Sequence, residues 1–291
     1  MCAKLSFSGH GLSEPLPQPL LRELENLAVS AARAAGQFIV QERPRGLGVL
    51  DTKSSINDIV TVMDRQSEAL LRAHLLAARP DDAILGEEDG ASEGTSGITW
   101  VIDPIDGTVN YLYEIPAYCV SVAAVIGDAG TPGQWQPVAG AVCNPLTAEV
   151  FHARAGGGAY VLQGDHDTAI GVNPVDVLLQ SLVATGFGYR PEVRARQGEV
   201  LAAILPEIGD IRRAGSAALD LCAVACGTVD AYYESGLNPW DLAAGWLIAT
   251  EAGALVSGLN NLAPGEAAVV AAGPGIHASL LSRLEALAPL R

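Results

Sequence analysis

The sequence is poor in charged and aromatic residues and has a deficit of basic ones. Of 291 residues, 17% are charged and 5% are aromatic, and 17 Lys and Arg stand against 33 Asp and Glu, a net charge of −16. This low charge density, with 49% hydrophobic residues, excludes an intrinsically disordered chain. The deficit of Lys and Arg disfavours nucleic acid as a partner, because neutralising phosphates needs basic side chains. Ala, Leu and Val dominate the hydrophobic residues, which favours a mixed helix-and-sheet protein packed through small side chains.

Long apolar runs and cysteine pairs are also missing. The longest apolar stretch, Leu242 to Val256, contains Thr250 and Glu251 and is shorter than the roughly 20 residues that span a bilayer, so no membrane span is expected. No apolar signal segment stands at the N-terminus, so secretion is not expected. Five cysteines without framework spacing indicate reduced thiols in a cytoplasmic protein. We expect Cys222 and Cys226, four apart in an apolar helical segment, to be core residues rather than a two-thiolate metal site.

Three common catalytic motifs do not occur in the sequence. There is no HExxH pair, no GxxxxGK[ST] loop and no GxSxG elbow. These absences disfavour a zinc site built on paired histidines, a P-loop nucleotide hydrolase and the commonest kind of serine hydrolase.

Hydrophobic periodicity divides the first half of the chain. Residues 1–19, rich in Pro, Gly and Ser, are expected to form a loose leader. Apolar spacings of three and four predict helices over 20–41 and from about Asp64 to just before Arg79, with a loop over 43–57 between them. Short apolar or alternating segments predict strands, and the expected ranges are 83–85, 98–102, 118–126, 137–144 and 149–153. A polar loop is expected over 90–97 and a glycine turn over 155–159.

After the glycine turn, strands and helices alternate, as in an α/β layer arrangement. The expected strands are 182–185, 211–213, 231–233 and 268–271, and the expected helices are 192–205, 216–226, 241–252 and 276–287. We therefore predict a leader over 1–19, an N-terminal α+β half over 20–155 with most metal ligands, and a C-terminal α/β half over 156–291, the two halves forming one catalytic unit.

Two acidic clusters follow apolar strands, where α/β proteins place their ligands. Gly86-Glu87-Glu88-Asp89 follows one strand, and Asp103-Pro104-Ile105-Asp106-Gly107-Thr108 follows another. Neighbouring clusters of carboxylates repel one another unless cations neutralise them. Hard divalent cations take oxygen ligands, and without clustered thiolates or imidazoles Mg²⁺ is the expected ion. Two carboxylates three residues apart can reach two cations, as in two-metal phosphoryl-transfer sites.

Several segments match known motifs. Trp100 to Tyr111 matches the signature WxxDPxDGTxNF, with Tyr111 in place of Phe, and Trp240 to Ala254 matches WDxAAGxxxxxEAGG, with Ala254 in place of the last Gly. Three further segments, 53–64, 213–218 and 230–234, fit the same pattern. From about residue 22 to 288 the chain resembles the inositol monophosphatase family of Mg²⁺-dependent, lithium-sensitive phosphatases. The resemblance implies an α+β fold, the five-layer αβαβα sandwich of sugar phosphatases, and a homodimer.

The resemblance also implies a set of two to three Mg²⁺ ions. Glu87, Asp103 and the Ile105 carbonyl would hold one ion. Asp103, Asp106 and Asp241 would hold a second, and Glu87 would help to hold a weaker third. Asp241 could instead be an ordinary helix N-cap, since Asp is favoured there.

Catalytic and substrate-binding roles follow from the same resemblance. Glu87 and the Thr108 hydroxyl, oriented by Asp64, would position and deprotonate the attacking water, and Lys53 would lie near the site unless it is only a solvated loop charge. Glu234 would accept hydrogen bonds from sugar hydroxyls unless it is an exposed residue at a strand end. The residues expected to contact substrate are Asp106, Gly107, Thr108, Gly215, Ser216, Ala217, Glu234 and Asp241.

The expected reaction is hydrolysis of inositol 1-phosphate, or a related polyol or sugar monophosphate, by in-line attack of a metal-activated water. Phosphatases of the same scaffold for histidinol phosphate, fructose 1,6-bisphosphate, NADP or a 3′-phosphoadenosine nucleotide stay open as alternatives. Nucleotides would favour more basic residues than are evident near Tyr232 to Asp241, whereas Glu234 favours a small neutral polyol. A role as a partner of the transcription machinery is the non-enzymatic alternative.

Overall fold

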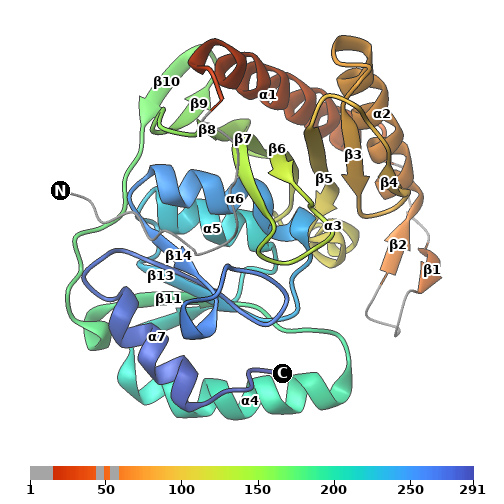
Figure 1. Ribbon diagram of the computed structural model, residues 1–291. Helices are drawn as coiled ribbons and strands as arrows, with labels where there is room; N and C mark the ends of the chain where they lie inside the picture. The colour runs from red at the N-terminus through yellow and green to blue at the C-terminus, as the bar shows by residue number, and fades with distance from the viewer. Residues whose placement is uncertain (1–15, 44–48, 53–58) are drawn as a thin grey trace.

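The protein is described by a computed structural model that covers residues 16–43, 49–52 and 59–291 (Figure 1). Lys53 and nearly all of the expected leader lie outside the described residues. The α-helices are α1 (Gln18–Gln41), α2 (Val62–Ala78), α3 (Thr108–Tyr113), α4 (Pro191–Ile204), α5 (Ala217–Ala225), α6 (Pro239–Glu251) and α7 (His277–Ala286). None of the described helices is long and apolar enough to cross a membrane.

An eight-stranded sheet forms the larger of the two main sheets. Its order is β10-β9-β8-β7-β6-β5-β3-β4, antiparallel except where β3 pairs with β5. The strands are β3 (Ala83–Gly86), β4 (Gly90–Ser92), β5 (Ile98–Asp106), β6 (Cys119–Gly127), β7 (Trp135–Asn144), β8 (Glu149–Arg154), β9 (Ala159–Gln163) and β10 (His166–Ala169). Side chains of β6 alternate between two cores: Val120 and Val122 face one, and Cys119 and Ala123 face the other. Both faces of this sheet are therefore covered.

A five-stranded sheet of order β12-β11-β13-β15-β14 forms the second main layer of strands. Its strands are β11 (Leu182–Thr185), β12 (Asp210–Arg212), β13 (Ala231–Glu234), β14 (Leu255–Ser257) and β15 (Val269–Ala272). A separate pair joins β1 (Val49–Thr52) to β2 (Ile59–Thr61).

Helices cover both sheets and fill the space between them, as Figure 1 shows from top to bottom. Helices α1 and α2 pack on the outer face of the larger sheet, α5 and α6 lie between the sheets, and α4 and α7 cover the outer face of the smaller one. The order of layers is helix, sheet, helix, sheet, helix. The expected five-layer αβαβα sandwich is confirmed.

Small residues let the central helices fit between the sheets. A Cβ atom at Gly245 of α6 would lie 2.7 Å from the Leu221 side chain of α5, and one at Gly140 of β7 would lie 3.2 Å from the Ala244 backbone. These contacts leave no room for larger side chains. The shortage of aromatic residues thus fits a layer of helices packed closely on both sides.

Most expected elements are present, with differences at weakly patterned segments. Part of the expected loop over 43–57 is strand β1, and residues 90–92 of the expected loop form β4. Neither segment has an alternating apolar pattern, and each strand is defined by its pairing with a neighbour, β1 with β2 and β4 with β3. Strand β5 runs four residues beyond its expected end at 102. The predicted division at residue 155 stays a prediction, and the larger sheet continues past it to Ala169.

Candidate active site

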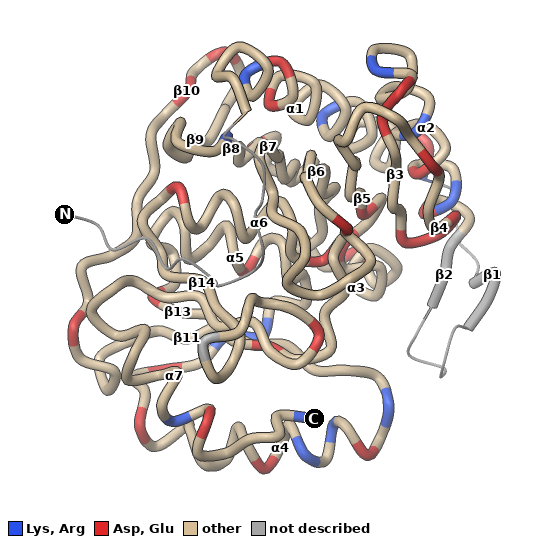
Figure 2. The backbone as a smooth tube through the Cα atoms, in the orientation of Figure 1, with Lys and Arg blue, Asp and Glu red and all other residues tan. Residues whose placement is uncertain are grey.

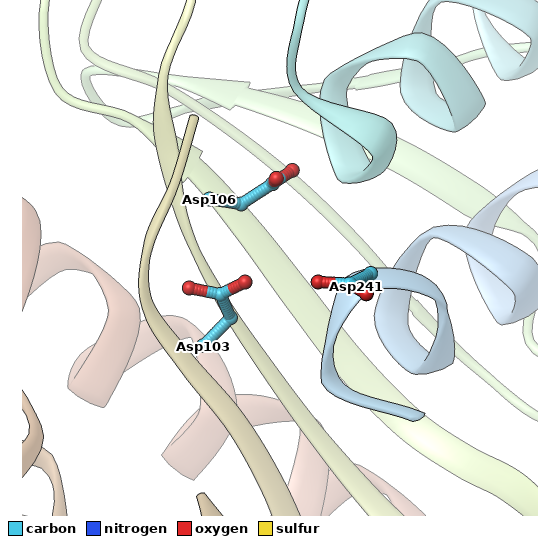
Figure 3. Close-up of side chains that lie close together, drawn as sticks. All are labelled: Asp103, Asp106 and Asp241. Carbon is cyan, nitrogen blue, oxygen red and sulfur yellow. The ribbon is translucent and has the colours of Figure 1, made fainter. Parts of the chain in front are cut away.

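Three aspartates from distant parts of the chain meet where the layers join. Asp103 and Asp106 lie at the end of β5, and Asp241 lies in the first turn of α6. One carboxylate oxygen of each lies within 4.8 Å of one oxygen of each of the others. In Figure 3 the side chains of Asp103 and Asp241 point toward each other across a gap, with Asp106 beside them. We call these three residues the aspartate cluster.

The cluster opens into a cleft of about 330 Å³. Glu87 and Glu234 also line this cleft, from the larger and the smaller sheet respectively. The other expected site residues that line it are Ile105, Gly107, Thr108, Gly215, Ser216 and Ala217. Asp64 is buried and contacts Thr108, whereas Lys53 is outside the described residues. Every described residue that was expected at the active site thus lines the cleft or, in the case of Asp64, contacts a residue that does.

Pro104 and Ile105 interrupt the pairing of β5 with β6, so that Asp103 and Asp106 both reach the cleft. The register shifts between the two aspartates, because Asp103 pairs with Ser121 and Asp106 pairs with Cys119. The Ile105 backbone N–H donates to Asp103 Oδ1 at 3.0 Å. One oxygen of Asp103 is therefore held by its own turn.

Asp106 is held by the first turn of α5. Its Oδ2 atom accepts hydrogen bonds from Ser216 Oγ at 2.6 Å and from the Ala218 backbone N–H at 2.7 Å. The Cys119 thiol lies 3.8 Å from the same oxygen. Ser216 Oγ also accepts a hydrogen bond from the Leu219 backbone N–H and so caps α5. The Ser216 hydroxyl is thus occupied within the protein, and its contact with substrate stays a prediction.

Asp241 is held by the start of its own helix. Asn238 is the N-cap of α6, and its backbone N–H donates to Asp241 Oδ2 at 2.6 Å in a capping box. Asp241 is therefore the third residue of the helix rather than its N-cap. All three aspartates share one arrangement, in which a backbone N–H fixes one carboxylate oxygen.

The cluster is electrostatically strained as a set of charged carboxylates. Burial raises the pKa of Asp103 well above its usual range, and the charges of Glu87, Asp106 and Asp241 raise it further. Burial also raises the pKa of Asp241 strongly, with a further contribution from Glu87. The pKa of Asp106 is raised by burial, although the hydrogen bonds from Ser216 and Ala218 lower it in part. Among the described residues, no Lys, Arg or His forms an ion pair with these three aspartates.

This donor set fits hard divalent cations. Anchored carboxylates with unneutralised charge, together with the nearby Ile105 carbonyl, supply the oxygen ligands that such cations take. It is the single group of possible metal ligands of this kind that the described residues form. Cys222 is buried and free, as expected for a core residue, and half-buried Cys226 is also a free thiol.

Two glycines that line the cleft, Gly107 and Gly215, lie close together. Gly107 has φ +96° and Gly215 has φ +97°, a backbone conformation that favours glycine. A Cβ atom at Gly107 would lie 2.9 Å from Ala117 O and 3.2 Å from Gly215 O. Asn110 joins the same segments, because its side-chain amide donates to Ala117 O at 2.6 Å and to Ala214 O at 2.8 Å. The glycines thus let the two backbones approach beside the aspartate cluster.

The Thr108 hydroxyl faces two acceptors. It lies 3.3 Å from Asp64 Oδ1 and 3.1 Å from Ile105 O. Its single proton can be given to either acceptor. The expected orientation of Thr108 by Asp64 is compatible with this geometry.

Glu234 lines the cleft and interacts with two buried groups, Tyr232 and Asp220. Its Oε2 atom accepts a hydrogen bond from Tyr232 Oη at 2.6 Å, and burial raises the Glu234 pKa to about 7 even though the Tyr232 bond and Arg213 lower it. Burial, with the charges of Glu234 and Asp106, raises the pKa of Asp220 to about 8. At neutral pH Glu234 and Asp220 together therefore carry less negative charge than the sequence suggests.

The structure adds cleft residues that sequence reasoning missed. Arg213 lines the cleft beside Gly215, and Phe187 and Tyr189 line it from the segment after β11. Arg213 belongs to the 213–218 segment that fits the family pattern, but the sequence does not indicate that its side chain faces the cleft, because this depends on the turn before α5. The GFGYR run after a strand was the available signal for the other two.

Comparison with known proteins agrees with this geometry. Residues 20–288 match the sequence model of the inositol monophosphatase family. An inositol-1-monophosphatase of Mycobacterium bovis is 45% identical over 280 residues, which cover 92% of this chain and 94% of that protein. A protein named Nus factor SuhB from Vibrio cholerae is 37% identical over 234 residues, which cover 80% and 84% of the two chains.

Solved structures show the same fold. Mycobacterium tuberculosis SuhB superposes with a TM-score of 0.73 at 41% identity, covering 96% of this chain and 100% of its own. Inositol monophosphatase from Anabaena superposes with a TM-score of 0.77 at 31% identity, covering 93% and 98%. The similarity therefore extends over the whole sandwich.

The raised pKa values predict that the cluster destabilises the metal-free protein. An unfolded Asp ionises near pH 3.9 while folded Asp103 holds its proton to higher pH, so stability falls as pH rises between these two values. We expect Asp103→Asn to raise the Tm of EDTA-treated protein at pH 8 by about 2–6 °C. In a chain of this length such a shift corresponds to an increase of ~1–2 kcal/mol in the free energy of unfolding. Differential scanning calorimetry measures this, with exposed Asp165→Asn as the charge-matched control. A lower Tm for metal-free Asp103→Asn than for the wild type would contradict the electrostatic account.

Proposed function

The chain belongs to the inositol monophosphatase family of phosphoric monoester hydrolases, and we propose that it is a Mg²⁺-dependent phosphatase acting on inositol 1-phosphate and related polyol or sugar monophosphates. The observation that carries the proposal is the convergence of Asp103, Asp106 and Asp241 on one gap, with no basic side chain paired to them among the described residues. Such a cluster repels a phosphate ester unless cations reverse the local charge. We also propose, from family membership, a homodimer in the cytoplasm.

The ligands follow the family pattern. Glu87, Asp103 and the Ile105 carbonyl would hold one Mg²⁺, Asp103, Asp106 and Asp241 a second, and Glu87 would contribute to a third. When bound, Mg²⁺ supplies positive charge that neutralises the carboxylates and stabilises negative charge developing on the phosphoryl group.

The chain's own groups provide proton handling and orientation. Half-buried Glu87 lines the cleft and can accept a proton from the attacking water. The Thr108 hydroxyl, in contact with Asp64, would orient that water. Glu87 and Thr108 follow strands of the larger sheet, whereas Glu234 lies in the smaller one, so proton transfer and recognition of the alcohol are assigned to different layers of the fold.

Recognition of the alcohol is assigned to Glu234 and the Gly215 to Ala217 segment, which line the cleft. Glu234 Oε2 is bonded to Tyr232, which fixes the carboxylate as an acceptor for a substrate hydroxyl. Gly186 has no side chain, and a Cβ atom there would lie 1.9 Å from Glu234 Oε2, so the carboxylate packs directly against the backbone of β11's end. A fixed acceptor in this place favours a polyol.

Other side chains that line the cleft bear on the range of substrates it accepts. Arg213, Phe187 and Tyr189 bring a cation and two aromatic rings to its wall, which keeps bisphosphates and nucleotides among the candidates. Histidinol phosphate, fructose 1,6-bisphosphate, NADP and a 3′-phosphoadenosine nucleotide are therefore the comparison substrates.

A second candidate role is association with the transcription machinery, which the name Nus factor SuhB of some relatives suggests. The complete aspartate cluster supports catalysis beside any such role. Association with RNA at moderate salt would support the binding role, whereas the net charge of −16 argues against it.

A phosphate-release assay tests the proposed activity. We expect release from inositol 1-phosphate with Mg²⁺, loss of release in EDTA, recovery when Mg²⁺ is restored, and inhibition by millimolar lithium as in the family. The comparison substrates should react more slowly at equal concentration. Full activity in a metal-free preparation would show that the proposed chemistry is wrong.

Two substitutions separate chemistry from recognition. Asp241→Asn removes a proposed metal ligand and should lower kcat on the order of 10²-fold or more for every substrate. Glu234→Gln removes a charge-assisted hydrogen bond worth about 1.5–3 kcal/mol and should act mainly on polyol phosphates. The ratio of kcat/KM between inositol 1-phosphate and p-nitrophenyl phosphate, measured at pH 8.5 where Glu234 is ionised, should fall in Glu234→Gln and hold in Asp241→Asn. The opposite pattern would mean that the two roles are exchanged.

A further inference from the structure

The turn that carries Glu87 is fastened to helix α2 by a buried carboxylate. Glu87, Glu88 and Asp89 connect β3 to β4, and Figure 2 shows acidic residues gathered at this corner. Glu68 of α2, 0% exposed, accepts hydrogen bonds from the backbone N–H of Glu88 at 2.8 Å and of Asp89 at 3.0 Å. The two donors are the residues that immediately follow Glu87 in the chain.

Arg72, one helical turn after Glu68, completes the attachment. Its guanidinium lies 2.8 Å from Glu68 Oε1 and donates to Gly90 O at 2.5 Å, so it binds both the carboxylate and the far end of the turn. Gly86 leaves room for this arrangement, because a Cβ atom there would lie 2.2 Å from Glu68 Oε1. Both ends of the turn are therefore shaped to receive the Glu68 carboxylate.

The same face of α2 holds the second acidic turn. Ser67 Oγ donates to Pro104 O at 3.2 Å, and Asp64 accepts from Thr108 Oγ1 at 3.3 Å. Asp64, Ser67 and Glu68 are spaced at i, i+3 and i+4, which places them on one side of a helix. One rigid element thus contacts the Glu87 turn and the Asp103–Thr108 turn.

A buried ion pair is a costly way to gain stability, because desolvating two charges offsets much of their attraction. A hydrophobic pair would fill the same space, but it could not accept two backbone N–H groups and bind the Gly90 carbonyl. The hydrogen bonds of the Glu68–Arg72 pair go to the turn that contains Glu87. Their placement points to a function in positioning rather than in stability alone.

We infer that Glu68, held by Arg72, is a positioning residue that sets where Glu87 stands relative to the aspartate cluster. The inference rests on the proposed role of Glu87 and adds the residue through which that role is fixed. Loss of the Glu68 charge should let the turn shift and should weaken metal binding where Glu87 contributes. Substrate recognition at Glu234 should be unchanged.

The test compares Glu68→Gln with a matched control. Gln keeps the shape but replaces one of the two acceptor oxygens with an NH₂ group, which then faces the backbone N–H of Glu88 or Asp89. Glu25→Gln is the control, because Glu25 is also buried, at 3% exposure, and pairs with Arg154 at 2.6 Å and with His152 at 2.9 Å away from the cleft. Both variants should lose thermal stability. Only Glu68→Gln should lower kcat, by about 10- to 100-fold on inositol 1-phosphate and p-nitrophenyl phosphate alike, the range for a misplacement of about 1 Å.

Titration calorimetry with Mg²⁺ provides a readout independent of turnover. Glu87→Gln identifies the Mg²⁺-binding step to which Glu87 contributes. We expect Glu68→Gln to weaken the affinity of that same step by about tenfold or more, whereas Glu25→Gln should bind Mg²⁺ like the wild type. If Glu68→Gln does not fold, Arg72→Lys carries the test, because a single ammonium replaces the Nε and Nη2 donors with which Arg72 binds Glu68 and Gly90 O. A smaller change in the same direction is expected. A folded Glu68→Gln or Arg72→Lys variant that keeps wild-type Mg²⁺ binding and kcat would overturn the inference. A wild-type protein without phosphatase activity would contradict the proposed function, and the calorimetric comparison would still decide on the positioning.

Discussion

Repulsion among carboxylates that the fold forces together is the constraint on which this structure depends. Asp103, Asp106 and Asp241 are brought within 4.8 Å by the end of β5 and the start of α6. Asp103 and Asp106 are buried and Asp241 is half-buried, so water screens their charges only weakly. The fold tolerates this because each aspartate has one oxygen bonded to a backbone N–H, from Ile105, Ala218 and Asn238. Those bonds fix the side chains in place but do not neutralise their charge. The remaining charge is what makes the cluster a site for divalent cations.

The elements around the cluster are arranged to keep it in shape. Helix α5 binds Asp106 through Ser216, which also caps the helix, so movement of α5 and movement of Asp106 are coupled. Helix α6 carries Asp241 in its first turn, and small residues such as Gly245 let α5 and α6 pack closely. Helix α2 binds both acidic turns from the other side. The site therefore lies where three helices meet the end of one strand.

Local sequence pattern predicted most of the helices and strands and the acidic turns, because each is expressed over a few residues. The five-layer order was implied by the family resemblance. Asp103 and Asp106 are recognisable from a strand followed by Asp-Pro-x-Asp-Gly, and the structure brings Asp241 to them as the motif match implied. Hydrogen bonds between distant segments could not be predicted from the sequence. Examples are the bond from the Glu88 backbone N–H to Glu68 and the bond from Ser216 to Asp106. The reason is that a Glu or Ser that will be buried has no local pattern to distinguish it from an exposed one. Strands β1 and β4 were not predicted for a similar reason, since they are defined by pairing with a neighbouring strand and have no apolar alternation. Arg213 in the cleft likewise depends on a turn whose direction only the folded chain shows.

Diffraction from crystals grown with Mn²⁺ in place of Mg²⁺ tests most directly whether the aspartate cluster binds divalent cations. Mn²⁺ takes the same oxygen ligands and scatters anomalously, so its position is read without reference to activity. We expect anomalous peaks within coordination distance of Asp103, Asp106 and Asp241, with a further peak that contacts Glu87. An aspartate cluster without any peak, in crystals that show Mn²⁺ at other surface carboxylates, would contradict it.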